Sequence, residues 1–524
     1  MKKWKALLSM VVTVILALSV VGCQSDKTSG PEEKEKDKDK GQEEKLSTFS
    51  IWTWLGAVEV WGGKSYDEVL AYQEMEKRTG VDAEYVHPTG DAAEAFNLMM
   101  TSGEMEDAIW YRWNPERAIQ YYDAGRIIDI YPLLKDNAPN LYKLIEGNKE
   151  LKKQLVDPEG RMFYMPWITL DKFLNQSEGL ALRQDWLEKV GADVPKTNDE
   201  LYEVLKKMKE QKVSGDKKFV GLTGYPSQMY KLFYGFGVAD DWYLEGDKVE
   251  YGPETDKYKE ALKWFNKLYE EGLMDKDYLT WEGDIYDKHL VDGQSAGMIE
   301  NSDSVSRVIK LAADSGSPFT FKPIPYMEYN GKPTSLNSTA KRIAQPYGLA
   351  ISSTAENPEA IVKYLDYGFT EEGQELFNWG IEGDTFVEAG GKKVFTDKVM
   401  KDPKNVPGLA ATKYTNSAWI TSTSVEATKA VLDDLGLQAR ETWSDVDISM
   451  AFEPILWMTA EENEIVTNAS TDIATYKDEM RDAFITGQKD IDEEWDSYVE
   501  TLKSMGNDEI KKAKQSAYDR YVKQ

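Results

Sequence analysis

The stretch that decides the fold runs from FSIWTW (49–54) through SYDEVLAYQEMEKRTG (65–80) to VDAEYV (81–86). The first and third segments predict β-strands, and the middle one predicts an amphipathic helix. DAAEAFNLMMTSG (91–103) then predicts a second helix and DAIWY (107–111) a third strand. Strands and helices that alternate at this spacing indicate a parallel, doubly wound sheet.

The same alternation continues further along the chain, where residues typical of helix ends mark the boundaries. Thr197 or Asn198 is suited to begin a helix over 194–210, because short polar side chains accept hydrogen bonds from free backbone amides. Pro358 suits a first helical turn, and Gly80 and Gly272 suit helix ends. We interpret these helices as packing elements without chemistry.

The N-terminal segment predicts export and lipid anchoring. An apolar run of about sixteen residues, Ala6–Val21, follows three lysines, and it is short for a membrane-spanning helix of about twenty residues. It ends in Gly22 and Cys23, which looks like the lipobox where bacterial lipoproteins are cleaved and lipidated; the alternative is a secreted protein with an incidental cysteine. Residues 1–22 are therefore expected to be a signal peptide, and 23–46, rich in charge, a disordered tether.

Composition narrows the classes of function. The 524 residues include a single cysteine, so an exported fold has no intrachain disulfide, and the length favours two domains. The formal net charge of −29 argues against nucleic acid or an anionic bilayer as the partner of the folded surface. Sixteen tryptophans offer flat apolar faces to a ligand.

Recognisable catalytic and cofactor motifs are absent from the sequence. The two histidines, His87 and His289, have no ligand spacing and no triad motif around them, and no HExxH, paired CxxC, GxGxxG or GxxxxGK[ST] pattern occurs. We therefore expect no catalytic residue, no cofactor and no metal ligand. A pair of catalytic carboxylates among 92 acidic residues stays open, as does a structural calcium site, although KDKDK (36–40) lacks the EF-hand glycine and glutamate.

Several stretches resemble one family, the carbohydrate-type extracellular solute-binding proteins (family 1) of ABC importers, in the large lipoprotein branch of Gram-positive bacteria. They span nearly the whole mature chain in order: SGEMEDAIW (102–110), YYDAGRIIDIYPLL (121–134), DPEGRMFYMPW (157–167), LRQDWLEKVGADVPKTNDELYEVL (182–205), LYEEGLMDKDY (268–278), DGQSAGMIE (292–300) and FITGQKDIDEEWDSYVETLKSMG (484–506). One departure is Glu106, where the family commonly has proline before the aspartate.

The resemblance implies an α/β, two-lobed periplasmic-binding-protein-like fold of type II, with a ligand cleft between lobes that crossing hinge segments join. It places the crossings near Phe163–Trp167, near Phe321–Tyr326 and near Gly383. The implied partners are an oligosaccharide, the membrane subunits of an ABC permease, and the outer face of the cell membrane through a lipid on Cys23, for a receptor that acts as a monomer. The lobe boundaries expected are 47–165 with 324–383 for lobe 1, and 166–323 with 384–524 for lobe 2.

Candidate ligand residues are aromatic and polar side chains at predicted strand ends, because sugars present C–H faces for stacking and hydroxyls at the rim. The residues that fit are Trp52, Trp54, Trp110, Arg112, Trp113, Trp167, Glu300 and Asp303. The family resemblance adds Tyr225 and Trp457. Each has a structural alternative: one of Trp52 and Trp54 belongs to the core by alternation, Trp110 fits a strand core, Trp113 fits a lid or the surface, and Arg112 fits a surface ion pair. Trp186, Trp264 and Trp495 lie in helical patterns and are expected to pack.

The function expected from these features is a lipid-anchored extracellular receptor that binds an oligosaccharide and passes it to a permease without covalent chemistry. Two alternatives stay open. The cargo is a peptide or another small polar solute, or the protein is an anchored glycoside hydrolase that uses two of its carboxylates.

Overall fold

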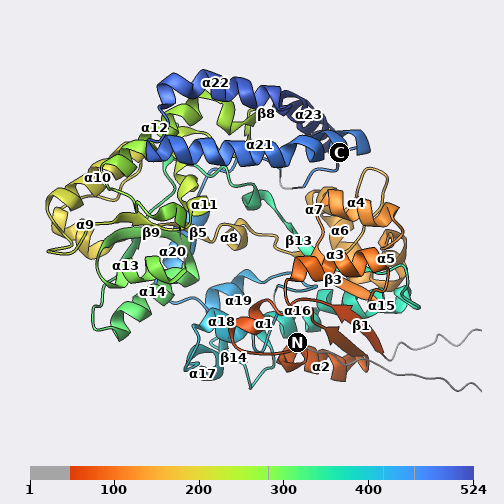
Figure 1. The fold of residues 1–524 in the computed structure, drawn as a ribbon. Helices are drawn as coiled ribbons and strands as arrows, with labels where there is room; N and C mark the ends of the chain where they lie inside the picture. The colour runs from red at the N-terminus through yellow and green to blue at the C-terminus, as the bar shows by residue number, and fades with distance from the viewer. Residues whose placement is uncertain (1–47, 281–282, 417, 454) are drawn as a thin grey trace, which may run out of the picture. The chain divides into compact units, whose positions relative to one another are not determined.

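Five strands form the first sheet, in the order β2-β1-β3-β13-β4 (Figure 1). The structure is a computed structural model that describes residues 48–280, 283–416, 418–453 and 455–524. The strands are β1 (Thr48–Trp52), β2 (Asp82–Val86), β3 (Ala108–Arg112), β4 (Met165–Ile168) and β13 (Ala344–Ile351). β1 runs parallel to β2 and β3, as the alternation predicted, whereas β13 is antiparallel to β3 and β4. The sheet is therefore mixed and not wholly parallel.

The helix predicted over 65–80 divides in two. Tyr66–Glu68 forms a single 3-10 turn, and α2 begins only at Leu70 (Leu70–Thr79) because Val69 is extended. The amide of Leu70 donates to the carbonyl of Lys413 at 3.2 Å, so a distant segment holds this break open. α2 ends at Gly80, whose φ of 68° is the left-handed conformation that glycine adopts at low cost.

Helices connect the strands of the first sheet along the chain. α3 (Ala92–Ser102) joins β2 to β3, and four short helices lie between β3 and β4. These four are α4 (Pro115–Asp123), α5 (Tyr131–Asn137), α6 (Pro139–Gly147) and α7 (Lys149–Leu155). With α1 (Ala57–Val60), α15 (Pro358–Leu365) and α16 (Glu371–Trp379) they surround one hydrophobic core centred on the first sheet.

The second sheet has four strands in the order β10-β5-β9-β6. They are β5 (Glu178–Arg183), β6 (Gly221–Thr223), β9 (Ser295–Asn301) and β10 (Phe321–Pro323), and β5 is antiparallel to both of its neighbours, β9 and β10. Two further cores flank this sheet. The helices beside it include α9 (Gln184–Val190), α10 (Asn198–Glu210), α12 (Asp256–Glu270), α13 (Gly283–Val291), α14 (Ser302–Asp314) and α20 (Asp434–Ser444).

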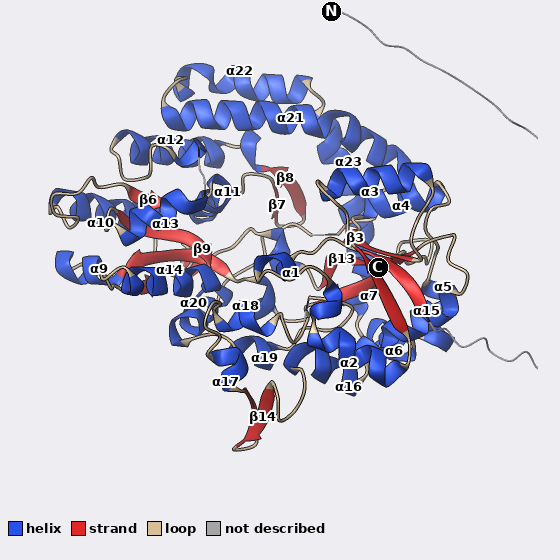
Figure 2. Cartoon of the chain, turned by 60° about the horizontal axis from the view of Figure 1, so that its bottom comes forward, coloured by secondary structure: helices blue, strands red, loops and turns tan. Residues whose placement is uncertain are grey.

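Three long helices end the chain. α21 (Ala460–Thr486) packs against α12 and α23 (Asn507–Lys523), and α22 (Ile491–Ser504) lies beside α21 (Figures 1 and 2). Residues of α21 and α22 contribute Ile473, Phe484 and Tyr498 to the core of the second sheet. The C-terminal helices thus complete the side of the molecule that holds α12.

The chain passes between the two sheets later than expected. Phe163 belongs to the first core and β4 to the first sheet, so the first passage lies at 169–177 and contains α8 (Lys172–Asn175). β10 still belongs to the second sheet, and Ile324, Met327 and Leu336 pack in its core, so the next passage lies at 337–343 and contains the 3-10 turn Ser338–Lys341.

The position expected for the third crossing, near Gly383, is wrong. Trp419 and Ile420 lie in the core of the first sheet, and Trp443 lies in a core of the second. A hairpin, β14 (Phe386–Ala389) and β15 (Lys392–Phe395), forms a small core with Trp379 of α16. The helices α17 (Asp397–Met400), α18 (Pro407–Ala411) and α19 (Val425–Ala430) follow it, so the segment after residue 383 does not pack wholly with the second sheet.

Among the described residues, no helix has the length and apolar character needed to cross a membrane. The predicted signal peptide, Cys23 and the tether lie outside the described residues.

Candidate functional site

Three of the tryptophans singled out from the sequence lie around one cavity of about 200 Å³, here called the tryptophan pocket. Its wall is formed by Trp54, Gly56, Val58, Tyr66, Val69, Trp110, Trp167, Tyr347, Thr412, Asn416 and Ala418. These residues come from the loop after β1, from β3, β4 and β13, and from the segment after α18. The strand order of the first sheet therefore brings together aromatic side chains that are far apart in the sequence.

Trp54 and Trp167 are the half-buried rings of this pocket. Trp54 is the second residue after β1, and its ring meets the rings of Tyr111 and Tyr347 edge-on at 5.8 Å. The indole nitrogen of Trp167 donates a hydrogen bond to the hydroxyl of Thr423 at 2.7 Å, which fixes the plane of the ring. Both rings thus have a defined orientation and an accessible face.

Trp110 forms a deeper part of the wall. Only 5% of it is exposed, and its ring stacks on Trp419 with the centroids 4.5 Å apart. Tyr66 is also buried, and burial raises the pKa of its phenol to about 12, so the hydroxyl stays protonated at neutral pH. The pocket therefore combines apolar ring faces with neutral hydrogen-bonding groups.

The other candidate tryptophans are core residues. Trp52 packs against Phe96 and Tyr111, whose rings stack on each other. Trp113 is 1% exposed and its indole nitrogen donates to the carbonyl of Ile109, so it is neither a lid nor a surface residue. Trp457 is buried, and it donates to the carbonyl of Lys153 at 3.2 Å. None of the three is part of the wall of the tryptophan pocket.

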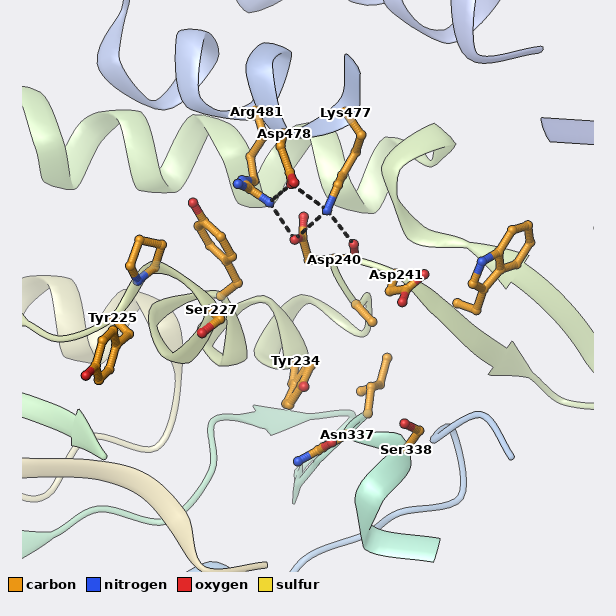
Figure 3. Close-up of a pocket in the computed structure, with 15 residues that line it drawn as sticks. Tyr225, Ser227, Tyr234, Asp240, Asp241, Asn337, Ser338, Lys477, Asp478 and Arg481 are labelled. Atoms are coloured by element: carbon orange, nitrogen blue, oxygen red, sulfur yellow. Dashed lines mark hydrogen bonds and ion pairs between the residues drawn. The ribbon is translucent and has the colours of Figure 1, made fainter. Parts of the chain in front are cut away.

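A second and larger cavity, about 590 Å³, lies beside the second sheet and is here called the charged pocket (Figure 3). Tyr225, the residue that the family resemblance added, lines it and is 39% exposed. The other wall residues are Pro226, Ser227, Tyr230, Tyr234, Ala239, Asp240, Asp241, Trp242, Leu336, Asn337, Ser338, Lys477, Asp478 and Arg481.

Four of the five charged side chains of this pocket are paired with one another. The carboxylate of Asp240 accepts hydrogen bonds from Arg481 at 2.7 Å and from Lys477 at 3.0 Å (Figure 3), and Arg481 also contacts Asp478. Burial alone would lower the pKa of Arg481, but the combined interactions with Asp240, Tyr258, Tyr230 and Asp482 outweigh it and raise this pKa. The guanidinium lies 4.0 Å above the ring of Tyr230. The network is thus rigid and locally balanced in charge.

The two acidic candidates lie in neither pocket. Glu300 is near the end of β9, is 4% exposed, and accepts hydrogen bonds from the backbone and side chain of Asn301; its burial raises its pKa. Asp303, in the first turn of α14, lines a separate cavity of about 220 Å³ that includes Asp402 and Asp433.

Arg112, the last residue of β3, is exposed and lies opposite Tyr347 in the pairing of β3 with β13. The alternative role expected for Arg112 was an ion pair with a surface carboxylate, and no such ion pair is present among the described residues. Its carbonyl accepts a hydrogen bond from the guanidinium of Arg117 at 2.7 Å.

Some residues of these pockets were not found from the sequence. Tyr347 is on β13, which reaches the first sheet from a distant part of the chain, and Lys477 and Arg481 are on α21, which looks like a packing helix. The spacing of Lys477 and Arg481, one helical turn apart, places both on one face and was the available signal.

No chemistry beyond binding is evident in the described part of the chain. Within it, no group of three or more His, Cys, Asp or Glu side chains lies close enough to hold a metal ion. His87 contacts the carbonyl of Thr53 at 2.8 Å, and His289 lies 3.1 Å from the carboxylate of Asp275, so both histidines are occupied by local contacts.

Comparison with known proteins gives a consistent result. Residues 62–375 match the family model described as bacterial extracellular solute-binding protein. The chain is 26% identical over 99% of both lengths to the fructooligosaccharide ABC transporter substrate-binding protein FusA of Streptococcus pneumoniae, and 26% identical to lipoprotein LipO of Bacillus subtilis over 98% of this chain and 97% of that one. The crystal structure of alginate-binding protein AlgQ2 without calcium superposes with a TM-score of 0.74 at 23% identity, covering 91% of this chain and 98% of that chain.

Proposed function

The chain belongs to the family of bacterial extracellular solute-binding proteins, and on that premise we propose that it binds an oligosaccharide and delivers it to the permease of an ABC importer. The observation that carries the proposal is the tryptophan pocket. Three indole rings and two tyrosines surround a cavity that is large enough for one sugar ring. Aromatic planes of this kind remove the C–H faces of a sugar from water, while Thr412 and Asn416 offer hydrogen bonds to its hydroxyls.

The charged pocket supports a ligand longer than one sugar. Its wall carries hydroxyl, amide and carboxylate groups together with the ring of Trp242. Asn337 and Ser338 belong to the passage between the sheets, so this pocket begins where the chain leaves the second sheet for the first. An oligosaccharide that stacks in the tryptophan pocket would extend toward these polar groups.

We also infer two lobes, each built on one sheet, that close around the ligand. The separate cores of the two sheets and the short passages at 169–177 and 337–343 support this division. Hinge closure at a few residues between lobes is a common motion of binding proteins. The closed form of the monomer would be the one that the permease recognises.

The membrane anchor is part of the same proposal. Gly22 and Cys23 at the end of the apolar run support lipidation of Cys23, and a relative over nearly the whole length carries the name lipoprotein. FusA, another relative of full length, is named as the substrate-binding protein of an ABC transporter, which supports a permease partner.

The direct test is a thermal-shift and calorimetry screen of the chain without residues 1–23 against neutral and acidic oligosaccharides, with peptides as a separate arm. A ligand at a hundredfold excess over its Kd stabilises the folded state by about 2.7 kcal/mol, a readily measured shift. Trp54→Ala and Trp167→Ala should weaken binding at least tenfold. Tyr142→Ala on α6, a half-buried ring outside both pockets, is the matched control.

Three results would reject the proposal. They are the absence of a response to every oligosaccharide, saturable binding of peptides alone, and release of new reducing ends from a bound sugar.

A further inference from the structure

Two arginines without an acidic partner lie beside the tryptophan pocket. Arg112 is the last residue of β3 and lies opposite Tyr347, whose ring lines the pocket. Arg342 lies two residues before β13, close enough to Arg112 for the two like charges to interact. In the described part of the chain, neither guanidinium forms an ion pair, although the protein carries 92 acidic and 63 basic residues. Neither cation is therefore neutralised by a carboxylate of the described residues.

Arg342 is held in place from its backbone. Its carbonyl accepts a hydrogen bond from the amide of Asn175 at 2.6 Å, and the next amide, of Ile343, donates to Gln154. Asn175 belongs to the first passage between the sheets and Arg342 to the second. Hydrogen bonds therefore fix the backbone of Arg342 at a place where the two passages contact each other.

The Arg342 guanidinium has no neutralising carboxylate beside it in the part of the chain that the structure describes. It is half-buried, and its Nε atom is shielded from water and has no hydrogen-bond partner among the described residues. Burial lowers its pKa, and the like charge of Arg112 lowers it further. A buried charge with no partner is costly, so this position is suited to an anion that arrives with a ligand.

The charged pocket provides a comparison within the same molecule. There Arg481 and Lys477 are paired with Asp240 and Asp478, so each of these cations already has a carboxylate partner. Nothing of this kind neutralises Arg112 and Arg342. The 3-10 turn Ser338–Lys341 rises about 2 Å per residue, so Ser338 of the charged pocket lies within about 8 Å of Arg342 along the backbone.

From this arrangement we infer that Arg112 and Arg342 bind the negatively charged group of an acidic oligosaccharide, a uronic acid carboxylate or a sulfate ester, whose neighbouring sugar ring stacks in the tryptophan pocket. The inference rests on the proposed oligosaccharide-binding function and specifies its substrate class. The overall charge of −29 does not prevent it, because at physiological ionic strength screening acts over about 8 Å and the two local cations dominate at the pocket. Guanidinium groups also match the planar, bidentate geometry of carboxylates and sulfates.

The test compares three matched trisaccharides by calorimetry: tri-galacturonate, a sulfated neutral trisaccharide and the unmodified neutral trisaccharide. At least one acidic sugar should bind at least tenfold more tightly than the neutral one, and its affinity should fall as salt is raised. Arg342→Gln and Arg112→Gln should each weaken the acidic sugar about 10- to 100-fold, the range expected for one charge-assisted hydrogen bond, while the binding of neutral sugar stays unchanged.

The control variant is Arg78→Gln, which removes a cation paired with Glu74 and Glu372 at the surface of α2 and should leave all affinities unchanged. The two acidic probes decide between carboxylate and sulfate. Equal binding of neutral and acidic sugars, or indifference of the acidic sugar to both arginine substitutions, overturns the inference and leaves oligosaccharide binding intact. If no sugar of any class binds, the proposed function itself fails and the inference with it.

Discussion

Trp54 and Trp110 line the same pocket, but the protein holds their rings differently. Trp110 is stacked on Trp419 and almost fully buried, whereas Trp54 is half-buried and meets its aromatic neighbours edge-on. Burial of ring area stabilises the fold in proportion to the surface removed from water. Trp110 therefore contributes mainly to stability, and Trp54 leaves more of its face to a ligand.

Alanine substitutions should separate these two contributions. Trp110→Ala should lower the free energy of unfolding by about 3–5 kcal/mol, because it leaves a cavity beside Trp419. Trp54→Ala should lower it by about 1 kcal/mol and weaken sugar binding far more than it affects stability. Urea unfolding followed by circular dichroism measures the first effect and calorimetry the second. Similar stability losses for the two variants would contradict this distinction.

The sequence indicated which residue types to examine but not which of them face the ligand. We expected one of Trp52 and Trp54 in the core, and Trp52 is the buried one. Alternation is not the reason, because residues two apart in a strand share a face; Trp54 differs because it lies beyond the end of β1. The burial of Trp110 depends on Trp419, and the orientation of Trp167 depends on Thr423. Both partners come from a distant segment whose path no local pattern reveals.

At the scale of secondary structure, the start of α21 is tied to the C-terminal helix. Thr459 and Glu462 form a reciprocal capping box, and the guanidinium of Arg520 on α23 donates to Glu462 at 2.7 Å. Burial would raise the pKa of Glu462, but its hydrogen bonds, that from Arg520 foremost, lower this pKa from 4.5 to about 2. The folded state therefore binds a proton here less readily than the unfolded state.

This difference predicts a defined pH dependence. The contribution of Glu462 to stability is present in full above about pH 4.5 and is lost as the pH falls through 2, because the folded pKa is the lower one. Glu462→Gln should cost about 1–2 kcal/mol at pH 6, allowing for solvent screening, and progressively less toward pH 2. Urea unfolding midpoints at several pH values measure this. Glu461→Gln, an exposed neighbour in the same turn, is the control, and a cost that does not change with pH would contradict the linkage.

Helix ends were more predictable than helix continuity. Thr197 caps α10 by accepting from the amide of Glu200, and Pro358 opens α15, as their side-chain chemistry indicated. The predicted helix over 65–80 is interrupted because the amide of Leu70 bonds to Lys413. Local chemistry determines where a helix stops, but only the folded chain shows where a tertiary hydrogen bond breaks it.

At the scale of the whole molecule, the family resemblance implied an α/β fold of the binding-protein type, and the structure, with its two main sheets, and its likeness to AlgQ2 confirm this. The path of the chain between the sheets was harder to predict from the sequence. Antiparallel β13 inserts between β3 and β4, and the segment after Gly383 returns to the first core through Trp419 before the chain reaches the second. Strand order and return segments depend on contacts between distant residues, and no periodicity encodes them.

If the two sheets are the centres of two closing lobes, ligand binding should shorten the distance between them. The single native cysteine lies at position 23, so a chain without residues 1–23 accepts dyes only at introduced cysteines. Dyes at Leu98 on α3 and Lys310 on α14, both exposed, should show a rise in energy transfer when the oligosaccharide saturates the protein. The control pair, Leu98 on α3 and Lys149 on α7, lies around the first sheet alone and should not change.

Whether the energy transfer of the first pair rises distinguishes between two ways of binding. A rise for the first pair with an unchanged control requires motion of one sheet relative to the other, which passages as short as 169–177 permit through a few backbone rotations. Trp54→Ala should move the midpoint of the rise to higher ligand concentration without altering its final level, since that ring contributes affinity and not the closed geometry. If energy transfer stays unchanged for both dye pairs when the oligosaccharide saturates the protein, the pockets bind the sugar as preformed sites. The hinge would then have no part in ligand capture.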